Sequence, residues 1–330
     1  MATDDNVLPM EAVLVGRLPE GNGWRYEPKW DGFRCLASKR NQTVRLRSKS
    51  GKPLERYFPD IKGVLEHLPV KQFVLDGELV VEGSGGYSFS DLQMRLHPAA
   101  SRVTMLAQKQ PATFVIFDIL GTEQGLSVLS VPFTERRLML EKFWKQHCSK
   151  EPAIKLSPQT DSITQAMKWL DSPGWYIDGI VAKKSTDAYV PNERVMQKYK
   201  RIRTADCVVG GFRYGSDSKH VGSLLLGLYD DKGRLNHVGF TSGIPKADRP
   251  SLTKKLERLI HEPGFTGNAP GAPSRWATER STEWKPLLPK IVVEVSFDHV
   301  SDHRFRHGTK LIRFRPDKSP RQCTMEQLDR

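Results

Sequence analysis

Residues 27–34 have the sequence EPKWDGFR, in which a lysine, an aspartate and a glycine fall within four positions. In an extended backbone, residues two apart point to the same side, so this segment predicts the ammonium of Lys29 beside the carboxylate of Asp31. Gly32 lacks a Cβ and lets a ligand approach the backbone closely. A surface strand with an ion pair fits the same pattern, so the segment alone leaves a structural and a functional interpretation open.

The rest of the chain repeats this combination of apolar strand and charged side chain. An ionised carboxylate in an apolar strand is costly unless it has a partner or a chemical task. Charged side chains recur in or beside apolar strands in five segments: DGE at 76–78, VIFD at 115–118, DGIVAK at 178–183, KYK at 198–200 and RFRPDK at 313–318. Together with the first segment they favour a catalytic site over isolated surface ion pairs.

The charge of the chain narrows the class of partner. Its 330 residues include 51 Lys and Arg against 38 Asp and Glu, a net charge of +13. This excess favours a polyanionic partner, nucleic acid first and an anionic membrane surface second. No apolar stretch approaches the ~20 residues of a membrane-spanning helix, and the acidic start is unlike a secretory signal. We therefore expect a cytoplasmic, nucleoid-associated protein with no membrane partner.

Four cysteines, Cys35, Cys148, Cys207 and Cys323, lie far apart in the sequence. Their spacing builds neither a disulfide framework nor a zinc ribbon. We expect all four to be reduced and to have a structural role.

The length and a change of pattern near residue 204 predict two domains. Residues 1–203 mix predicted strands, such as 43–49, 73–81 and 113–120, with helices whose caps are expected at Ser90, Thr134 and Asp161. Residues 204–330 contain five short predicted strands and one helix, which suit a small β-barrel of the OB type, with a sandwich as the alternative. The predicted fold class is α+β.

In their order from Lys29 to Lys318, the six segments resemble motifs I, III, IIIa, IV, V and VI of the covalent nucleotidyltransferase superfamily. Within it the chain looks like an ATP-dependent DNA ligase. The flanks of the motifs are similar to the short bacterial ligases of the C type, and the ligase domain of bacterial ligase D is a more distant relative. The resemblance implies an adenylation (nucleotidyltransferase) domain of antiparallel sheets and helices over 1–203, followed by an OB-fold domain over 204–330.

The resemblance also assigns the central chemistry. Joining a 5′-phosphate to a 3′-hydroxyl needs a leaving group on the phosphate, and a lysine amine can carry AMP from ATP to the DNA end as a phosphoramidate. Lys29 would be that nucleophile, with Asp31 in the same catalytic set. Lys198 and Lys200 would hold the α-phosphate and stabilise the charge on its oxygens during transfer.

Contacts to the nucleotide are likewise implied by the resemblance. Glu78 is expected to contact the ribose, Phe117 to stack on adenine and Glu27 to help select the adenine amino group. Arg34 would reach the nucleotide or the nick, and Lys183 completes the set of cofactor-binding residues.

The resemblance places a divalent metal, Mg²⁺ or Mn²⁺, on Glu78 and Asp178. Magnesium takes one or two carboxylates and completes its coordination with water and phosphate. Asp178 stands where the family usually has glutamate. Aspartate is one methylene shorter than glutamate, so the carboxylate of Asp178 reaches less far toward the metal.

Contacts to DNA are expected from both domains. Lys49 stands where ligases commonly carry an arginine against the DNA 5′-phosphate, so the charge is kept but the bidentate geometry is not. Arg315, Asp317 and Lys318 match the motif with which the family's OB domain orients the ATP pyrophosphate before it turns another face to DNA. Few residues precede Lys29, so we expect a two-domain clamp of modest affinity that weakens steeply with salt.

The leading hypothesis is an ATP-dependent DNA ligase that seals 3′-hydroxyl/5′-phosphate nicks or breaks through a lysyl-AMP intermediate, in DNA repair. An RNA ligase or mRNA-capping-type nucleotidyltransferase is the alternative within the superfamily. A non-catalytic OB-fold protein that binds nucleic acid is the alternative outside it. We expect a monomer that acts on nicked or broken duplex DNA, with a DNA-end-binding factor among its candidate repair partners.

Overall fold

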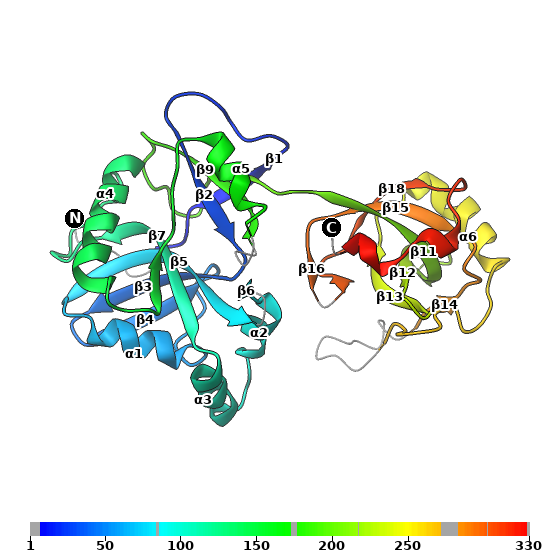
Figure 1. Cartoon of the computed structure of the whole chain (residues 1–330), viewed down its shortest axis with the longest axis horizontal. Coiled ribbons are helices and arrows are strands. Elements are labelled where there is room, and N and C mark those ends of the chain that lie inside the picture. The colour runs from blue at the N-terminus through cyan, green and yellow to red at the C-terminus, as the bar shows by residue number, and fades with distance from the viewer. Residues whose placement is uncertain are drawn as a thin grey trace. The chain divides into compact units, whose positions relative to one another are not determined.

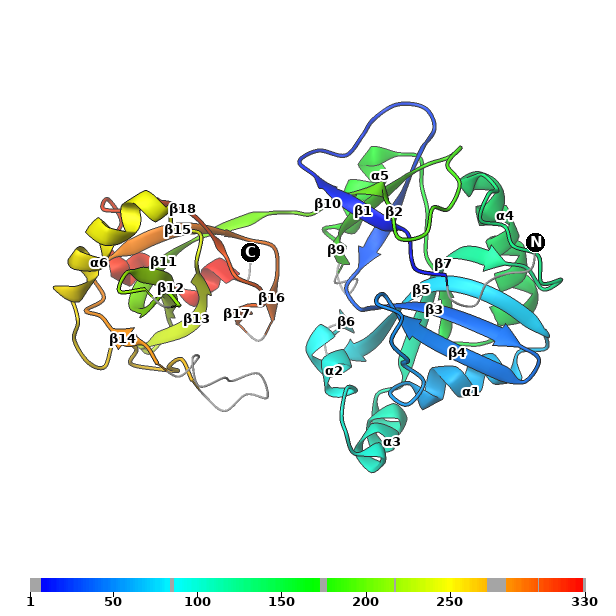
Figure 2. The same ribbon diagram turned by 180° about the vertical axis from the view of Figure 1, so that it is seen from behind.

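The structure, a computed structural model, describes residues 7–83, 86–172, 177–216, 218–271, 283–301 and 303–328. The chain divides into two compact units, Met1–Arg201 and Ile202–Arg330, seen from opposite sides in Figures 1 and 2. This division falls just before the expected boundary between residues 203 and 204. Within the described residues, no helix combines the length and the apolar character that crossing a membrane demands.

A six-stranded sheet lies at the centre of the first unit. Its order is β4-β3-β5-β7-β8 with β6 beside β5, and every pair is antiparallel except β7 with β8. The long apolar runs of β5 and β7 are buried on both faces, which explains their central places. The strands are β3 (Phe33–Arg40), β4 (Thr43–Ser48), β5 (Gln72–Gly83), β6 (Gly86–Tyr87), β7 (Ala112–Gly121) and β8 (Ile154–Leu156).

Alternation along β5 separates a core face from a functional face. Phe73, Leu75 and Leu79 pack into a hydrophobic core with residues of the helices. Asp76 and Glu78 have the other parity and therefore point to the opposite side of the sheet. The alternation along β5 that places apolar side chains in the core thus places both carboxylates on the opposite face.

Helices cover the core face of this sheet, and α1 lies against β4 in both views (Figures 1 and 2). Ser88 and Ser162, rather than the expected Ser90 and Asp161, cap α2 and α5. The cap is the residue directly before the first helical residue, whereas Ser90 lies inside α2 and Asp161 lies one position before the cap of α5. Thr134 lies inside α4, where its hydroxyl donates to the carbonyl of Ser185 at 3.1 Å. The helices are α1 (Pro59–His67), α2 (Phe89–Met94), α3 (Ala100–Lys109), α4 (Phe133–Phe143) with its π-helical extension η1 (Trp144–Cys148), and α5 (Ile163–Trp169).

A second sheet of four strands completes the first unit, in the order β1-β10-β9-β2. β1 (Glu11–Val15) is parallel to β10 (Arg194–Tyr199), while β9 (Ile177–Lys184) and β2 (Trp24–Trp30) pair antiparallel. Tyr26, Ile180 and Ala182 pack against α5 on one side of this sheet. Glu27 and Val181, which directly follow Tyr26 and Ile180 in the sequence, line a cavity.

The second unit is OB-like, with antiparallel strands in the order β13-β12-β11-β15-β18 and a short β14 beside β11. Within the described residues this ladder does not close into a complete barrel; one isolated parallel bridge, Thr241 to Thr309, links its two edges. The main elements are β11 (Arg203–Tyr214), β12 (Val221–Tyr229), β13 (Leu235–Thr241), η2 (Lys246–Asp248), α6 (Arg249–Glu257), β14 (Lys285–Pro286), β15 (Val292–Phe297), β16 (Val300–Ser301), β17 (Arg304–Phe305), β18 (Lys310–Phe314), η3 (Pro320–Gln322) and η4 (Met325–Leu328).

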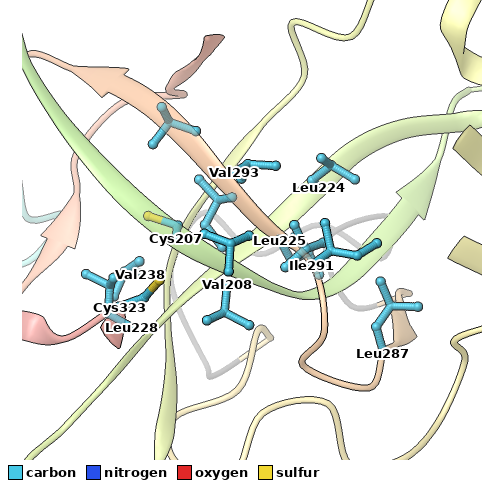
Figure 3. Packing of buried hydrophobic residues seen from close by; sticks show 14 of the residues in the cluster. Cys207, Val208, Leu224, Leu225, Leu228, Val238, Leu287, Ile291, Val293 and Cys323 are labelled. Atoms are coloured by element: carbon cyan, nitrogen blue, oxygen red, sulfur yellow. The ribbon is translucent and has the colours of Figure 1, made fainter. Parts of the chain in front are cut away.

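The core of the second unit is shown in Figure 3, where side chains of β11, β12 and β15 interdigitate. Cys207 and Cys323 are fully buried in this core, and Cys35 and Cys148 are fully buried in the core of the first unit. All four are free cysteines in the structure, and their reduced state stays a prediction.

Candidate active site

Both sheets of the first unit contribute to one cavity of about 860 Å³, within the usual range for small-molecule sites. The predicted site residues that line this cavity come from the motif segments, with the exception of Lys49. They are Glu27, Lys29, Arg34, Lys49, Glu78, Phe117, Lys183 and Lys198.

Lys29 is held at the cavity by a carboxylate from the neighbouring strand. Its Nζ donates to Asp178 Oδ2 at 2.6 Å, and Lys200 Nζ lies 3.0 Å from the same oxygen. Burial acts to raise the pKa of Asp178, but Lys29 and Lys200 outweigh it and hold the pKa below the usual value. Asp31, which was expected beside Lys29, lies one residue beyond the end of β2 at Trp30.

Two glycines allow strands to approach each other around Lys29. A Cβ on Gly32 would lie 2.1 Å from the carbonyl oxygen of Leu79 in β5. Gly179, which pairs with Lys29, has φ +156°, and a Cβ there would lie 2.0 Å from the carbonyl oxygen of Tyr199. Gly32 also lines the cavity, so the expected approach of a ligand stays a prediction beside the observed approach of β5.

The pKa of Lys198 is affected by several neighbouring cations. Burial first, and then the positive charges of Lys29, Lys200 and Lys49, lower its pKa. The charge of Glu11 acts in the opposite direction but does not offset them. Such a group of cations attracts a phosphate strongly.

Arg34 is fixed in place by a buried carboxylate. Its Nε and Nη2 donate to the two oxygens of Asp76 at 2.6 and 2.7 Å, a bidentate pair. Tyr189 Oη also donates to Asp76, at 2.7 Å. The guanidinium carbon of Arg34 lies 4.5 Å from the ring centre of Phe117. The structure therefore presents Arg34 and Phe117 to the cavity as one stacked unit.

Glu27 and Lys183 form a buried ion pair in the cavity wall. Lys183 Nζ lies 2.7 Å from Glu27 Oε2, and the exposed fractions of their side chains are only 5% and 3%. Arg137 approaches the other oxygen of Glu27 at 3.8 Å. Lys183 also lies 5.0 Å from the ring centre of Phe117, so the pair borders the same wall as the stacked Arg34.

Glu78 is a carboxylate of the cavity wall whose pKa is raised. Burial raises its pKa to about 7, against the opposing charges of Arg34 and Lys29. The described residues contain no group of three or more His, Cys, Asp and Glu side chains that could hold a metal. Mg²⁺ needs only one or two carboxylates besides water and phosphate, so Glu78 and Asp178 fit that kind of site.

Lys49 at the cavity and the expected cations of the second unit each contact a carboxylate. Lys49 is 60% exposed and places Nζ 2.9 Å from Glu11 Oε1. Arg315 follows β18 in the second unit, where it donates to Asp206 at 2.9 and 3.1 Å and to Asp317 at 2.8 Å. Lys318 lies 3.6 Å from Asp206, so Arg315, Asp317 and Lys318 form one cluster around that carboxylate.

Asp76 and Glu11 are site residues that the sequence did not reveal. Asp76 is fully buried, and as a carboxylate in an apolar strand it needs a partner for the same reason as Glu78. That signal could have identified Asp76. No comparable signal marks Glu11, because its partner Lys49 is 38 positions away in sequence and the two meet only through the fold.

Comparison with known families agrees with this architecture. Residues 12–200 match the family described as ATP dependent DNA ligase domain, and residues 217–318 match the ATP dependent DNA ligase C terminal region. The class defined by the two units and the lysine cavity is thus that of nucleotidyltransferases that join nucleic acid. The chain belongs to the family of ATP-dependent DNA ligases, enzymes that use ATP and act on DNA.

The curated relatives are similar over nearly the whole chain. DNA ligase C2 of Mycolicibacterium smegmatis is 40% identical over 98% of this chain and 94% of its own length. DNA ligase C of Mycobacterium tuberculosis is 37% identical with the same coverage, 98% and 94%. Among solved structures, the ligase domain from M. tuberculosis LigD has 27% identity and a TM-score of 0.52, covering 97% of this chain and 98% of that one. A mycobacterial DNA ligase D complexed with ATP and MES has 26% identity, a TM-score of 0.52 and the same coverage.

Proposed function

We propose that this ligase seals 3′-hydroxyl/5′-phosphate breaks in duplex DNA through an AMP that is carried covalently on Lys29. The observation that carries the proposal is the position of Lys29 Nζ in the cavity, 2.6 Å from the buried Asp178 and grouped with Lys198 and Lys200. An amine, an acceptor for its proton and cations for the phosphate are the parts that adenylyl transfer needs.

In the first step, Lys29 Nζ attacks the α-phosphorus of ATP. The N–P bond forms, the bond to the pyrophosphate oxygen breaks, and pyrophosphate leaves. An ammonium has no lone pair, so a proton must leave Nζ first, and Asp178 Oδ2 is close enough to accept it. Lys198 and Lys200 then stabilise the charge on the α-phosphate oxygens.

In the second and third steps, AMP passes from Lys29 to the DNA 5′-phosphate and leaves when the 3′-hydroxyl attacks. We assign Lys49 to the 5′-phosphate, with its single charge in place of an arginine fork. Arg315, Asp317 and Lys318 are assigned to the pyrophosphate of ATP. Arg315 must first exchange Asp206 or Asp317 for that anion.

The nucleotide itself is assigned to the cavity wall. Phe117 would stack on adenine, Glu78 would contact the ribose, and Glu27 with Lys183 would border the adenine amino group. Arg34 and Asp31 complete the set on the side of the nucleophile. Support comes from their common cavity, where all but Asp31 are lining residues.

A divalent metal, Mg²⁺ or Mn²⁺, would supply charge neutralisation at the triphosphate, held by Asp178 and Glu78. In the structure Asp178 contacts two lysines instead, so metal binding requires at least one of them to give way. Repair of chromosomal breaks is the role we propose, because relatives of the chain include proteins named for end joining and DNA repair. That role implies a location at the nucleoid and a DNA-end-binding partner; a monomer suffices for the chemistry.

The intact mass of the full chain tests the proposal directly. Incubation with ATP and Mg²⁺ should add one AMP per chain, and nicked DNA should remove it again. Lys29→Arg keeps the charge but should take up no AMP, while Lys219→Arg, an exposed lysine of the second unit, should label normally. Labelling of the Lys29 variant would contradict the proposal. GTP in place of ATP, and an RNA nick in place of a DNA nick, should be poor substrates.

A further inference from the structure

We propose that Glu11 occupies the position of a substrate phosphate in the cavity, and that it competes with this phosphate for Lys49. The inference rests on the proposed function, in which Lys49 receives a phosphate. It makes Glu11 a built-in counter-anion that sets how tightly a phosphorylated end is bound.

The contacts of Glu11 are those of an anion in a cationic recess. It lines the cavity, and its Oε1 lies 2.9 Å from Lys49 Nζ. Its Oε2 lies 3.7 Å from Arg194 Nε on the paired strand. The hydrogen bond from Lys49 is the main cause that lowers the pKa of Glu11, and Lys198 adds to it. Three cations therefore surround one carboxylate at the place where a phosphate is expected.

Glu11 reaches the cavity from the first residue of β1 and lines it together with Ala12. The pairing of β1 with β10 shifts register between these two residues, because β10 has one extra residue, Val195, between their partners Arg194 and Met196. Such an extra residue is a bulge, which bends the strand that contains it. The irregularity therefore lies in β10, directly after Arg194, the second cation that Glu11 approaches.

The other carboxylates near the cavity are bound more firmly than Glu11. Glu27 and Lys183 are almost fully buried together, and Asp76 is fully buried under Arg34. In contrast, the side chains of Glu11 and Lys49 are 23% and 60% exposed. Exposed ion pairs are weak because water competes for both charges. The Glu11–Lys49 pair is therefore the one that an incoming phosphate can separate at least cost.

Replacing the carboxylate by its amide should free Lys49 for phosphate. For the full chain, Glu11→Gln should tighten binding of a nicked duplex with a 5′-phosphate about two- to fivefold, the range for a partly exposed ion pair. Binding of the same duplex with a 5′-hydroxyl should change little. Fluorescence anisotropy in EDTA measures both affinities without turnover.

Glu20→Gln is the matched control, since it removes the same charge from an exposed ion pair with Arg17 that does not line the cavity. Glu20→Gln should change the affinities for the two duplexes by equal factors. Titration with ATP forms a third arm, because the nucleotide also carries phosphates. A gain for ATP in Glu11→Gln alone would support the same phosphate position and assign it to the nucleotide.

Two results would overturn the proposal. Weaker binding of the phosphorylated duplex by Glu11→Gln would mean that Glu11 holds Lys49 in its working position. Equal effects of Glu11→Gln and Glu20→Gln on every ligand would mean that only net charge matters. Lys49→Met should abolish the gain in a double variant. Failure of the proposed function would appear separately, as absence of AMP in the mass measurement.

Discussion

At the residue scale, the contact between Lys29 and Asp178 explains why the site could be predicted only in part. The order of the motif residues predicted Lys29, Glu78, Phe117 and Lys198, and the fold brings them into one cavity. Asp31 was expected beside Lys29 because the two are close in the sequence, whereas Asp178 was expected as a metal ligand and not as the partner of Lys29. The actual carboxylate is 149 positions away and is delivered by the pairing of β2 with β9. Contacts of that kind depend on register, which a motif does not contain.

Asp178→Asn should slow lysyl-AMP formation by about 10² or more, because the amide can neither accept the proton of Lys29 nor neutralise Lys200. Asp178→Glu restores the charge and should keep more of the activity. Single-turnover labelling with ATP measures the rate. Asp171→Asn is the control, since Asp171 pairs with Arg201 on the surface. Labelling by Asp178→Asn at the wild-type rate would remove Asp178 from the mechanism.

Glu78 should make the stability of the metal-free protein depend on pH near neutrality. Burial raises its folded-state pKa to about 7, above the ordinary 4.5, so protonation favours the folded state. Its contribution is present below pH 4.5 and is lost as the pH rises through 7. Relative to Glu78→Gln, the wild type should therefore lose on the order of 2 kcal/mol between pH 5 and pH 8.

Thermal unfolding of both proteins across this pH range is the measurement. Glu82→Gln, an exposed position on the same strand β5, should follow the wild type at every pH. If Glu78→Gln also follows the wild type, the carboxyl of Glu78 is ionised throughout and the expected proton linkage is absent.

At the element scale, the prediction of the strands rested mainly on the pattern of apolar and charged residues. The segment 73–81 was expected as a buried strand, and β5 spans it with two carboxylates on one face. The helices α1 and α3 were not predicted, since α1 begins at a proline without a side-chain cap and α3 also lacks one. Tertiary packing rather than a local start signal stabilises them. The second unit was expected as an OB-type barrel, and its strand order supports this, although among the described residues the barrel stays open.

Gly32→Ala should separate β3 from β5 at the site. The added Cβ would lie 2.1 Å from a backbone oxygen, which cannot rotate away as a side chain does. We expect a loss of about 2–3 kcal/mol in the free energy of unfolding and slower adenylation. Gly63→Ala in α1 meets no atom within 4 Å and should instead stabilise by about 0.5–1 kcal/mol. Calorimetry compares the two, and equal stability would contradict the close approach.

At the scale of the whole molecule, composition predicted the class of partner and motif order predicted the family. The net charge of +13 is by itself a reason to expect nucleic acid as the partner. Two units were expected and two are observed, each with its own hydrophobic core. The dependence of DNA binding on salt and the roles of individual residues stay predictions, because they concern complexes with DNA and nucleotide.

The four thiols should not react with thiol reagents while the chain is folded. Cys35, Cys148, Cys207 and Cys323 have no exposed surface, and burial raises the pKa of each. A thiol reacts as its thiolate and only where a reagent can reach it. Ellman's reagent should therefore detect none of the four before denaturation and all four after it. One rapidly reacting thiol in the folded protein would contradict the buried positions.

Because the native thiols should not react, cysteines introduced into the natural chain can be labelled selectively with fluorescent dyes. One cysteine introduced at the exposed Ser149 and another at the exposed Lys219 would accept a donor and an acceptor dye, while the native thiols stay unmodified. Energy transfer between the dyes would then follow the separation of the two units through each stage of catalysis, one molecule at a time.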